Sequence, residues 1–204
     1  MEVLLDPASP VRRHYAKLAQ NLLSLEDRVR SMVVTSPETG AGCSSVCIGL
    51  GAALAEMGKR VVVVDCNLGR PNLHRMLGEP NFIGLTSCLQ SGRALENYGH
   101  DLVPGLLAVP TGPVSSDPVA RIESQRFVEV VRGIEAHRDI VILDAPVAEK
   151  VIESPALSSQ FDGVLLVIHA SRTSKNTARE VTDDLLDAGV NLLGVVLNGA
   201  GESV

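Results

Sequence analysis

The chain has 204 residues, of which 45% are hydrophobic and 2% aromatic, with no tryptophan and a formal net charge of −6. This length and apolar content suit a folded protein with an aliphatic core. The acidic balance and the absence of a Lys and Arg cluster argue against a nucleic-acid-binding surface, so we expect no nucleic-acid partner.

The sequence also bears on location and redox state. No apolar run reaches the length of a membrane span, and the first residues lack the basic region and apolar core of a secretion signal. We therefore expect a cytoplasmic protein, or one held at the inner face of the cell membrane through a partner. The four cysteines lack CxxC or zinc-finger spacing, and cytosolic thiols stay reduced, so we expect no structural disulfide.

Helix and strand patterns alternate along the chain. An amphipathic helix is predicted over 10–25, and we expect it to pack on the sheet edge. The later patterns predict, in order, a strand over 32–35, a helix over 44–57, a strand over 60–65, a short helix over 74–77, a strand over 106–109, a helix over 126–137, a strand over 139–144, a helix over 153–160, a strand over 163–169, a helix over 175–188 and a strand over 192–198. The rest of 78–118 is expected to be irregular. This alternation predicts an α/β fold, a doubly wound and mostly parallel sheet flanked by helices, in a single domain over 1–204.

A glycine-containing loop over 36–45 joins the first predicted strand to a long helix pattern. In a phosphate-binding loop the glycines let backbone N–H groups surround phosphate oxygens, a lysine neutralises the outer phosphates, and the next hydroxyl holds Mg²⁺. Gly40, Gly42 and Ser44 fit this scheme, but Cys43 stands where the lysine is expected. The loop predicts a P-loop NTPase-like scaffold whose chemistry has been weakened or abandoned.

Polar side chains end two of the predicted strands. Asp65, with Asn67 close behind it, ends the second strand, and Asp144 ends the strand over 139–144. Ligands of open parallel sheets bind beyond the carboxyl ends of the strands, where P-loop proteins place carboxylates linked to Mg²⁺. If a nucleotide binds, we expect Ser44, Asp65 and Asp144 to hold Mg²⁺.

Together these motifs resemble the cytoplasmic ATP-binding domain of the bacterial tyrosine kinases (BY-kinases) of polysaccharide synthesis and export. The resemblance covers nearly the whole chain: a leading helix (10–23), a Walker A loop (36–45), a second Asp motif (61–74), a central loop (109–113 with 117–118), a Walker B strand (139–146) and the last two strands (161–173 and 194–199). Related partitioning ATPases carry a lysine early in the loop. Glu38 occupies that place here, which favours the polysaccharide-kinase branch.

The resemblance implies a ligand and a partner. The cofactors would be ATP or ADP with Mg²⁺, and the partner a membrane polysaccharide copolymerase or a related export protein. The implied nucleotide contacts are Gly40, Ala41, Gly42, Cys43, Ser44, Ser45 and Asn198. Asn198 would recognise the adenine edge, although a role as a plain turn residue is equally open.

The departures from the family pattern are as informative as the matches. Cys43 replaces the lysine, and Asn67 replaces a second Asp that assists Mg²⁺ and the attacking hydroxyl. The family's ring-forming Glu, Arg and Arg on the leading helix read Arg13, Ala16 and Ala19, which argues against the ring and leaves a homodimer open. The family's tyrosine-rich tail is not seen, and the tyrosines of the sequence are Tyr15 and Tyr98.

Three hypotheses follow. The first is a catalytically inactive, kinase-like protein that regulates or scaffolds polysaccharide assembly and binds nucleotide weakly or not at all. The second is an active tyrosine kinase or ATPase that takes its cation from Lys150, Lys175 or a neighbouring subunit. The third is a thiol switch at Cys43, because a helix N-terminus lowers the pKa of a thiol.

The cysteines and histidines were also considered as metal-binding or catalytic residues. A metal site built from Cys43, Cys47 and Cys66 would lack a fourth ligand. His74 and His169 are expected to be structural, because neither lies beside a plausible nucleophile in the sequence pattern.

Overall fold

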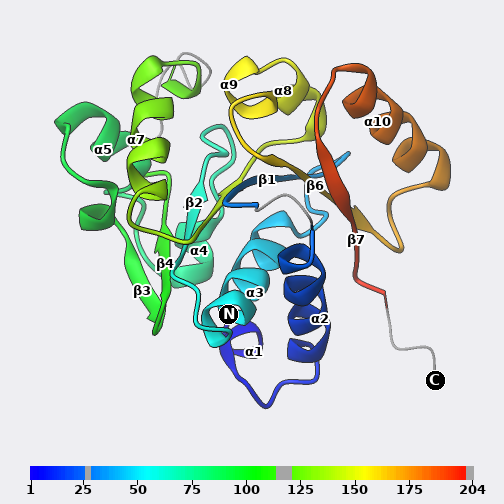
Figure 1. Cartoon of the computed structure of the whole chain (residues 1–204), viewed down its shortest axis with the longest axis horizontal. Coiled ribbons are helices and arrows are strands. Elements are labelled where there is room, and N and C mark those ends of the chain that lie inside the picture. The colour runs from blue at the N-terminus through cyan, green and yellow to red at the C-terminus, as the bar shows by residue number, and fades with distance from the viewer. Residues whose placement is uncertain (26–28, 114–120, 201–204) are drawn as a thin grey trace.

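A computed structural model describes residues 1–25, 29–113 and 121–200. Within these ranges the centre of the molecule is a seven-stranded sheet in the order β3-β4-β2-β5-β1-β6-β7, with helices on both faces (Figure 1). The strands are β1 (Ser31–Thr35), β2 (Val61–Asp65), β3 (His100–Val103), β4 (Leu106–Val109), β5 (Ile140–Asp144), β6 (Gly163–His169) and β7 (Leu192–Asn198). Neighbouring strands are parallel except for β3, which pairs antiparallel with β4. The predicted α/β fold, doubly wound and mostly parallel, is confirmed.

The helices form two layers. In Figure 1, α7, α8, α9 and α10 lie on one side of the sheet, and α1, α2 and α3 lie on the other. The helices are α1 (Glu2–Leu5), α2 (Arg12–Leu23), α3 (Cys43–Glu56), α4 (Leu73–Leu77), α5 (Leu85–Ser91), the 3₁₀ helix η1 (Leu95–Tyr98), α7 (Gln125–Glu135), α8 (Ala148–Ile152), α9 (Pro155–Ser158) and α10 (Lys175–Asp187). None of the helices in the described ranges is long and apolar enough to cross a membrane.

The core consists of two mainly aliphatic clusters, one on each face of the sheet, with Phe127 in one and Tyr15 in the other. Side chains of a strand alternate between faces, so Val33 joins one cluster while Met32 and Val34 join the other. Every residue of β1, β2 and β5 is buried, because these inner parallel strands are covered on both sides. Polar side chains that could bind a ligand are therefore expected at the ends of these strands and not within them.

Two parts of the predicted secondary structure were wrong. The region 78–118, expected to be irregular outside one strand, contains α5, η1 and the hairpin strand β3. These elements are four to seven residues long, too short to show a clear hydrophobic period. The helix predicted over 153–160 is the shorter α9, because Ser154 caps α9 by accepting the Leu157 N–H and Pro155 opens that helix. The separate helix α8, which precedes it, was not predicted.

The leading helix packs on α3 and not at the sheet edge, which corrects the earlier expectation. Arg12 is buried, and its guanidinium donates to the carbonyl of Gly49 at 3.1 Å and pairs with Glu56 at 2.5 Å. The ring of Tyr15 lies over Gly49, where an added Cβ would come within 2.4 Å of it. Ala19, one of the three positions compared with the ring-forming motif, is fully buried in the same hydrophobic cluster as Tyr15.

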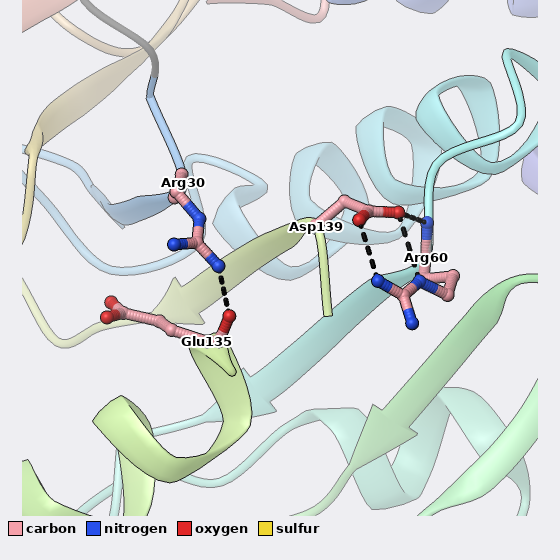
Figure 2. A network of polar contacts seen from close by, with 4 residues as sticks. All are labelled: Arg30, Arg60, Glu135 and Asp139. Carbon is pink, nitrogen blue, oxygen red and sulfur yellow. Dashed lines mark hydrogen bonds and ion pairs between the residues drawn. The ribbon is translucent and has the colours of Figure 1, made fainter. Parts of the chain in front are cut away.

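Polar contacts connect the chain at the N-terminal ends of the parallel strands (Figure 2). Arg60, just before β2, and Asp139, just before β5, form a two-pronged pair, with Nη2 to Oδ1 at 2.9 Å and Nε to Oδ2 at 3.2 Å. The Arg60 backbone N–H also donates to Asp139, at 2.8 Å. Close by, the Arg30 guanidinium donates to the backbone carbonyl of Glu135. The contacts between Arg60 and Asp139 align β2 with β5, the two strands that end in carboxylates.

The Arg60 contacts lower the pKa of Asp139 to about 2. An aspartate with a lowered pKa contributes stability that is present above its unfolded value, near 3.9, and is lost as the pH falls through the folded value. We therefore expect Asp139→Asn to lower the melting temperature slightly at pH 7, because the pair is exposed, and the difference from the native chain should vanish between about pH 4 and pH 2. Thermal unfolding followed by circular dichroism measures this. Asp101→Asn, on the exposed face of edge strand β3, is the matched control, and an equal pH-dependent effect there would contradict the assignment.

Candidate functional site

The loop between β1 and α3 has the backbone of a phosphate cradle. Gly40 and Gly42 adopt left-handed φ values of +86° and +97°, which favour glycine, and Gly42 caps the N-terminus of α3. From the end of β7, the Asn198 amide donates to the Ala41 carbonyl at 2.8 Å. A Cβ on Gly42 would lie 2.1 Å from that amide nitrogen, so the close approach of β7 also requires a glycine.

The first half of the loop is fastened by the segment between β6 and α10. The Thr173 hydroxyl donates to the Glu38 carboxylate at 2.6 Å, and Ser36 donates to the Glu38 carbonyl at 2.8 Å. Arg172 Nη1 lies 3.5 Å from the Gly40 carbonyl oxygen. Glu38 is therefore held at the wall of the loop by Thr173. Sequence reasoning placed Arg172 and Thr173 in a family motif but assigned them no role, since nothing in the local pattern links them to residues more than 130 positions away.

The two strand-end carboxylates come together as predicted. Asp65 and Asp144 are register partners on adjacent strands, and both are buried. Asp65 accepts backbone hydrogen bonds from Leu73 at 2.9 Å, from Asn72 at 3.0 Å and from Asn67 at 3.1 Å. Asn67 is thus positioned beside Asp65 through its backbone N–H.

Burial raises the pKa of both carboxyl groups of this pair. For Asp144 the nearby Asp65 charge raises the pKa further, and a hydrogen bond from Ser44 only partly opposes this rise. None of the ion pairs between described residues involves either carboxylate. The pair therefore retains a proton at a pH where ordinary carboxyl groups have lost theirs, and a cation placed between Asp144 and Ser44 would displace it.

Cys43 begins α3, and its environment opposes thiolate formation. Its pKa is raised to about 12, chiefly because the thiol is buried; a hydrogen bond with Ser36 lowers the pKa and the nearby Asp144 charge raises it. The expectation of a lowered pKa at a helix N-terminus was wrong, because desolvation outweighs the helix dipole. Burial also raises the pKa of Cys47 and Cys66. All four cysteines are free, and the described residues contain no cluster of His, Cys, Asp or Glu with the geometry of a metal site.

A cavity of about 1200 Å³ opens above the loop. The predicted site residues that line it are Gly40, Ala41, Gly42, Cys43, Ser44, Asn67 and Asp144. Ser45, Asp65 and Asn198 do not line it, and of these Asp65 and Asn198 support residues that do. The loop backbone thus fits a polyphosphate, and Ser44 with Asp144 fits Mg²⁺.

Cationic side chains also line the cavity. They are Arg70, Arg75 and Lys150, whereas Lys175 does not line the cavity. Lys150 is engaged by Glu153 at 2.7 Å. Sequence reasoning proposed Lys150 and Lys175 as substitute cations and missed Arg75, which the turn at 66–72 and helix α4 bring into the wall.

The two histidines occupy different settings. His74 lines the cavity, with its Nδ1 buried and without a hydrogen-bond partner among the described residues, and burial and Arg75 lower its pKa. His169 packs on Gly199 and hydrogen bonds to Ser171 through Nδ1. The structural role expected for both stays a prediction.

Comparison with protein families gives a match to the CobQ/CobB/MinD/ParA nucleotide binding domain over residues 32–203. The putative tyrosine-protein kinase EpsB of Ralstonia nicotianae is 32% identical over 177 residues, which cover 86% of this chain and 24% of EpsB. The chain thus spans about a quarter of the length of that relative. The tyrosine-protein kinase YwqD of Bacillus subtilis is 29% identical over 197 residues, covering 95% of this chain and 83% of YwqD.

Solved structures share the fold. The chimerical protein CapA2B2 superimposes with a TM-score of 0.90 at 25% identity, covering 99% of this chain and 92% of the chimera. The septum site-determining protein MinD from Pyrococcus horikoshii, complexed with Mg-ADP, gives a TM-score of 0.67 at 25% identity over 85% of this chain and 72% of MinD. The chain belongs to the CobQ/CobB/MinD/ParA nucleotide-binding domain family and is homologous to the bacterial tyrosine-protein kinases.

Proposed function

We propose that this chain is a kinase-like nucleotide-binding module with little or no phosphoryl-transfer activity, which regulates or scaffolds cell-surface polysaccharide assembly. The observation that carries the proposal is Cys43, a protonated and uncharged thiol at the position from which a lysine would reach the outer phosphates. Phosphoryl transfer depends mainly on positioning and charge stabilisation, and removal of one preorganised group costs about 10²- to 10³-fold in rate.

Weak nucleotide binding is part of the proposal. The loop N–H groups and the start of α3 favour an anion, while the buried carboxylates beside Cys43 oppose one. Mg²⁺ held by Ser44 and Asp144 would supply the positive charge that the loop itself lacks. The chain's own residues would then orient the phosphates: Gly40 and Gly42 through their backbone, and Asn198 by keeping the loop closed.

The proposed partner is a membrane polysaccharide copolymerase or a related export protein, which would hold the module at the inner face of the cell membrane. The homology to tyrosine kinases such as EpsB and YwqD supports this choice. An active kinase or ATPase is the second candidate, because Arg70, Arg75 and Lys150 lie in the cavity wall and could substitute for the lysine.

Replacing Cys43 with lysine tests whether the rest of the phosphate-binding loop is intact. We expect ADP and ATP, measured by calorimetry with Mg²⁺, to bind Cys43→Lys about 10- to 100-fold more tightly than the native chain, because a charge-assisted hydrogen bond to phosphate contributes about 1.5–3 kcal/mol. Cys43→Met, an uncharged side chain of intermediate length, is the control and should show no gain. Equal affinities of the native chain and Cys43→Lys would show that the site does not lack a cation.

Turnover separates the two candidate functions. We expect single-turnover hydrolysis of Mg²⁺-ATP by the native chain, with and without a membrane extract containing the copolymerase, to be no faster than hydrolysis by Asp144→Ala. ATP hydrolysis by the native chain that is abolished by Asp144→Ala would contradict the proposal that the chain is inactive. A loss on Lys150→Ala would then identify the substitute cation.

The raised pKa of Cys43 predicts that its thiol reacts slowly with alkylating reagents. At pH 7 we expect iodoacetamide to label Cys43 at least about 100-fold more slowly than the same cysteine in an unfolded peptide, since the thiolate is the nucleophile. Peptide mapping by mass spectrometry resolves the four cysteines. Labelling as fast as in the unfolded peptide would restore the thiol-switch hypothesis.

A further inference from the structure

Helix α10 carries a regular stripe of charges on its exposed surface. It is the outermost helix of its layer in Figure 1, and the chain runs from it into β7, the edge strand of the sheet. Lys175, Arg179, Asp183 and Asp187 follow one another at intervals of four residues, so their side chains lie in a single slowly turning row. All four are exposed. The row is basic in the first half of the helix and acidic in the second.

This order of charges is unfavourable within a single helix. A helix N-terminus favours acidic side chains and a C-terminus favours basic ones, yet α10 has no acidic residue in its first turn and no basic residue in its last. An acidic residue four positions before a basic one is the better order, and Arg179 and Asp183 reverse it. None of the four makes an ion pair with another described residue. The monomer therefore leaves this row uncompensated.

A second copy of α10 running antiparallel would match the row completely. Around a twofold axis that passes between positions 179 and 183, Lys175 of one copy faces Asp187 of the other, and Arg179 faces Asp183. The symmetry generates each pair twice, as an isologous interface requires. A parallel copy would set like charges against each other.

Exposed apolar side chains occur on α10 and on β7. Leu186 on α10 is 53% exposed, and Val195 and Leu197 on β7 are 50% and 60% exposed. Val195 and Leu197 are register partners of Leu166 and Ile168 on β6, which contact the cluster that α10 covers. Both therefore lie on the α10 face of the sheet. Among the described strands, β7 pairs with β6 alone, which leaves its outer edge open.

We propose that the side of the molecule formed by α10 and β7 binds a second copy of this chain, with the two α10 helices antiparallel. The charged row fixes the direction and register of the pair, and Leu186, Val195 and Leu197 supply the apolar contact. This interface differs from the leading helix, where the family's ring-forming positions are Arg13, Ala16 and Ala19. It is also independent of nucleotide binding, so its test does not depend on the proposed function.

Charge exchange across the interface is the decisive experiment. Sedimentation equilibrium of the full chain should show a monomer–dimer equilibrium that weakens with added salt. We expect Arg179→Glu and Asp183→Arg to raise the dimer dissociation constant at least about tenfold each, since like charges then face each other. An equimolar mixture of the two variants should recover native dimerisation, because every facing pair is again opposite in sign. A native chain that stays monomeric, or a mixture no more associated than its components, would overturn the proposal.

Two controls separate the interface from folding. Glu180→Arg changes an exposed charge of α10 outside the row and should leave the dissociation constant unchanged, whereas Leu197→Glu should raise it. Circular dichroism melting confirms that each variant is folded before it is scored. An equal loss of dimer in Glu180→Arg and in Arg179→Glu would contradict the predicted register.

Discussion

The candidate site depends on a balance of charge at the carboxyl ends of the parallel strands. Asp65 and Asp144 are buried side by side at the ends of β2 and β5, and no lysine extends from the glycine loop to meet them. Two carboxylates in that setting cannot both ionise readily, so they hold a proton until a cation arrives. The pocket therefore has the shape of a phosphate site, while its charge resists phosphate unless Mg²⁺ enters with it.

Much of the surrounding structure maintains that pocket. The Arg60–Asp139 pair aligns the beginnings of β2 and β5 at the opposite edge, and Thr173 and Asn198 hold the loop from β6 and β7. Retention of these contacts without the lysine is what a binding module would need, because recognition requires shape and catalysis also requires charge. The segment that fastens the loop leads directly into α10, so the proposed dimer surface begins next to the pocket.

Fold and site differed in how far sequence could predict them. Apolar runs such as Val61 to Asp65 predicted buried parallel strands. The strand-end carboxylates were expected to lie close together because the carboxyl ends of parallel strands lie on the same side of the sheet. Short elements within 78–113 were missed because hydrophobic periodicity needs more residues than they contain. The pKa of Cys43 could not be anticipated from its place at a helix start, since burial and the Asp144 charge come from the tertiary structure. Residues 117–118, which carried part of the family resemblance, lie outside the described ranges.

A crystal structure with Mg²⁺ and a non-hydrolysable ATP analogue would show how the site holds a triphosphate without the lysine. We expect phosphates held by the backbone N–H groups of the loop and by Mg²⁺ on Ser44 and Asp144, with no ammonium or guanidinium group in hydrogen-bond contact with the outer phosphates. A triphosphate contacted there by Arg70, Arg75, Lys150 or a cation of a second copy would contradict this expectation.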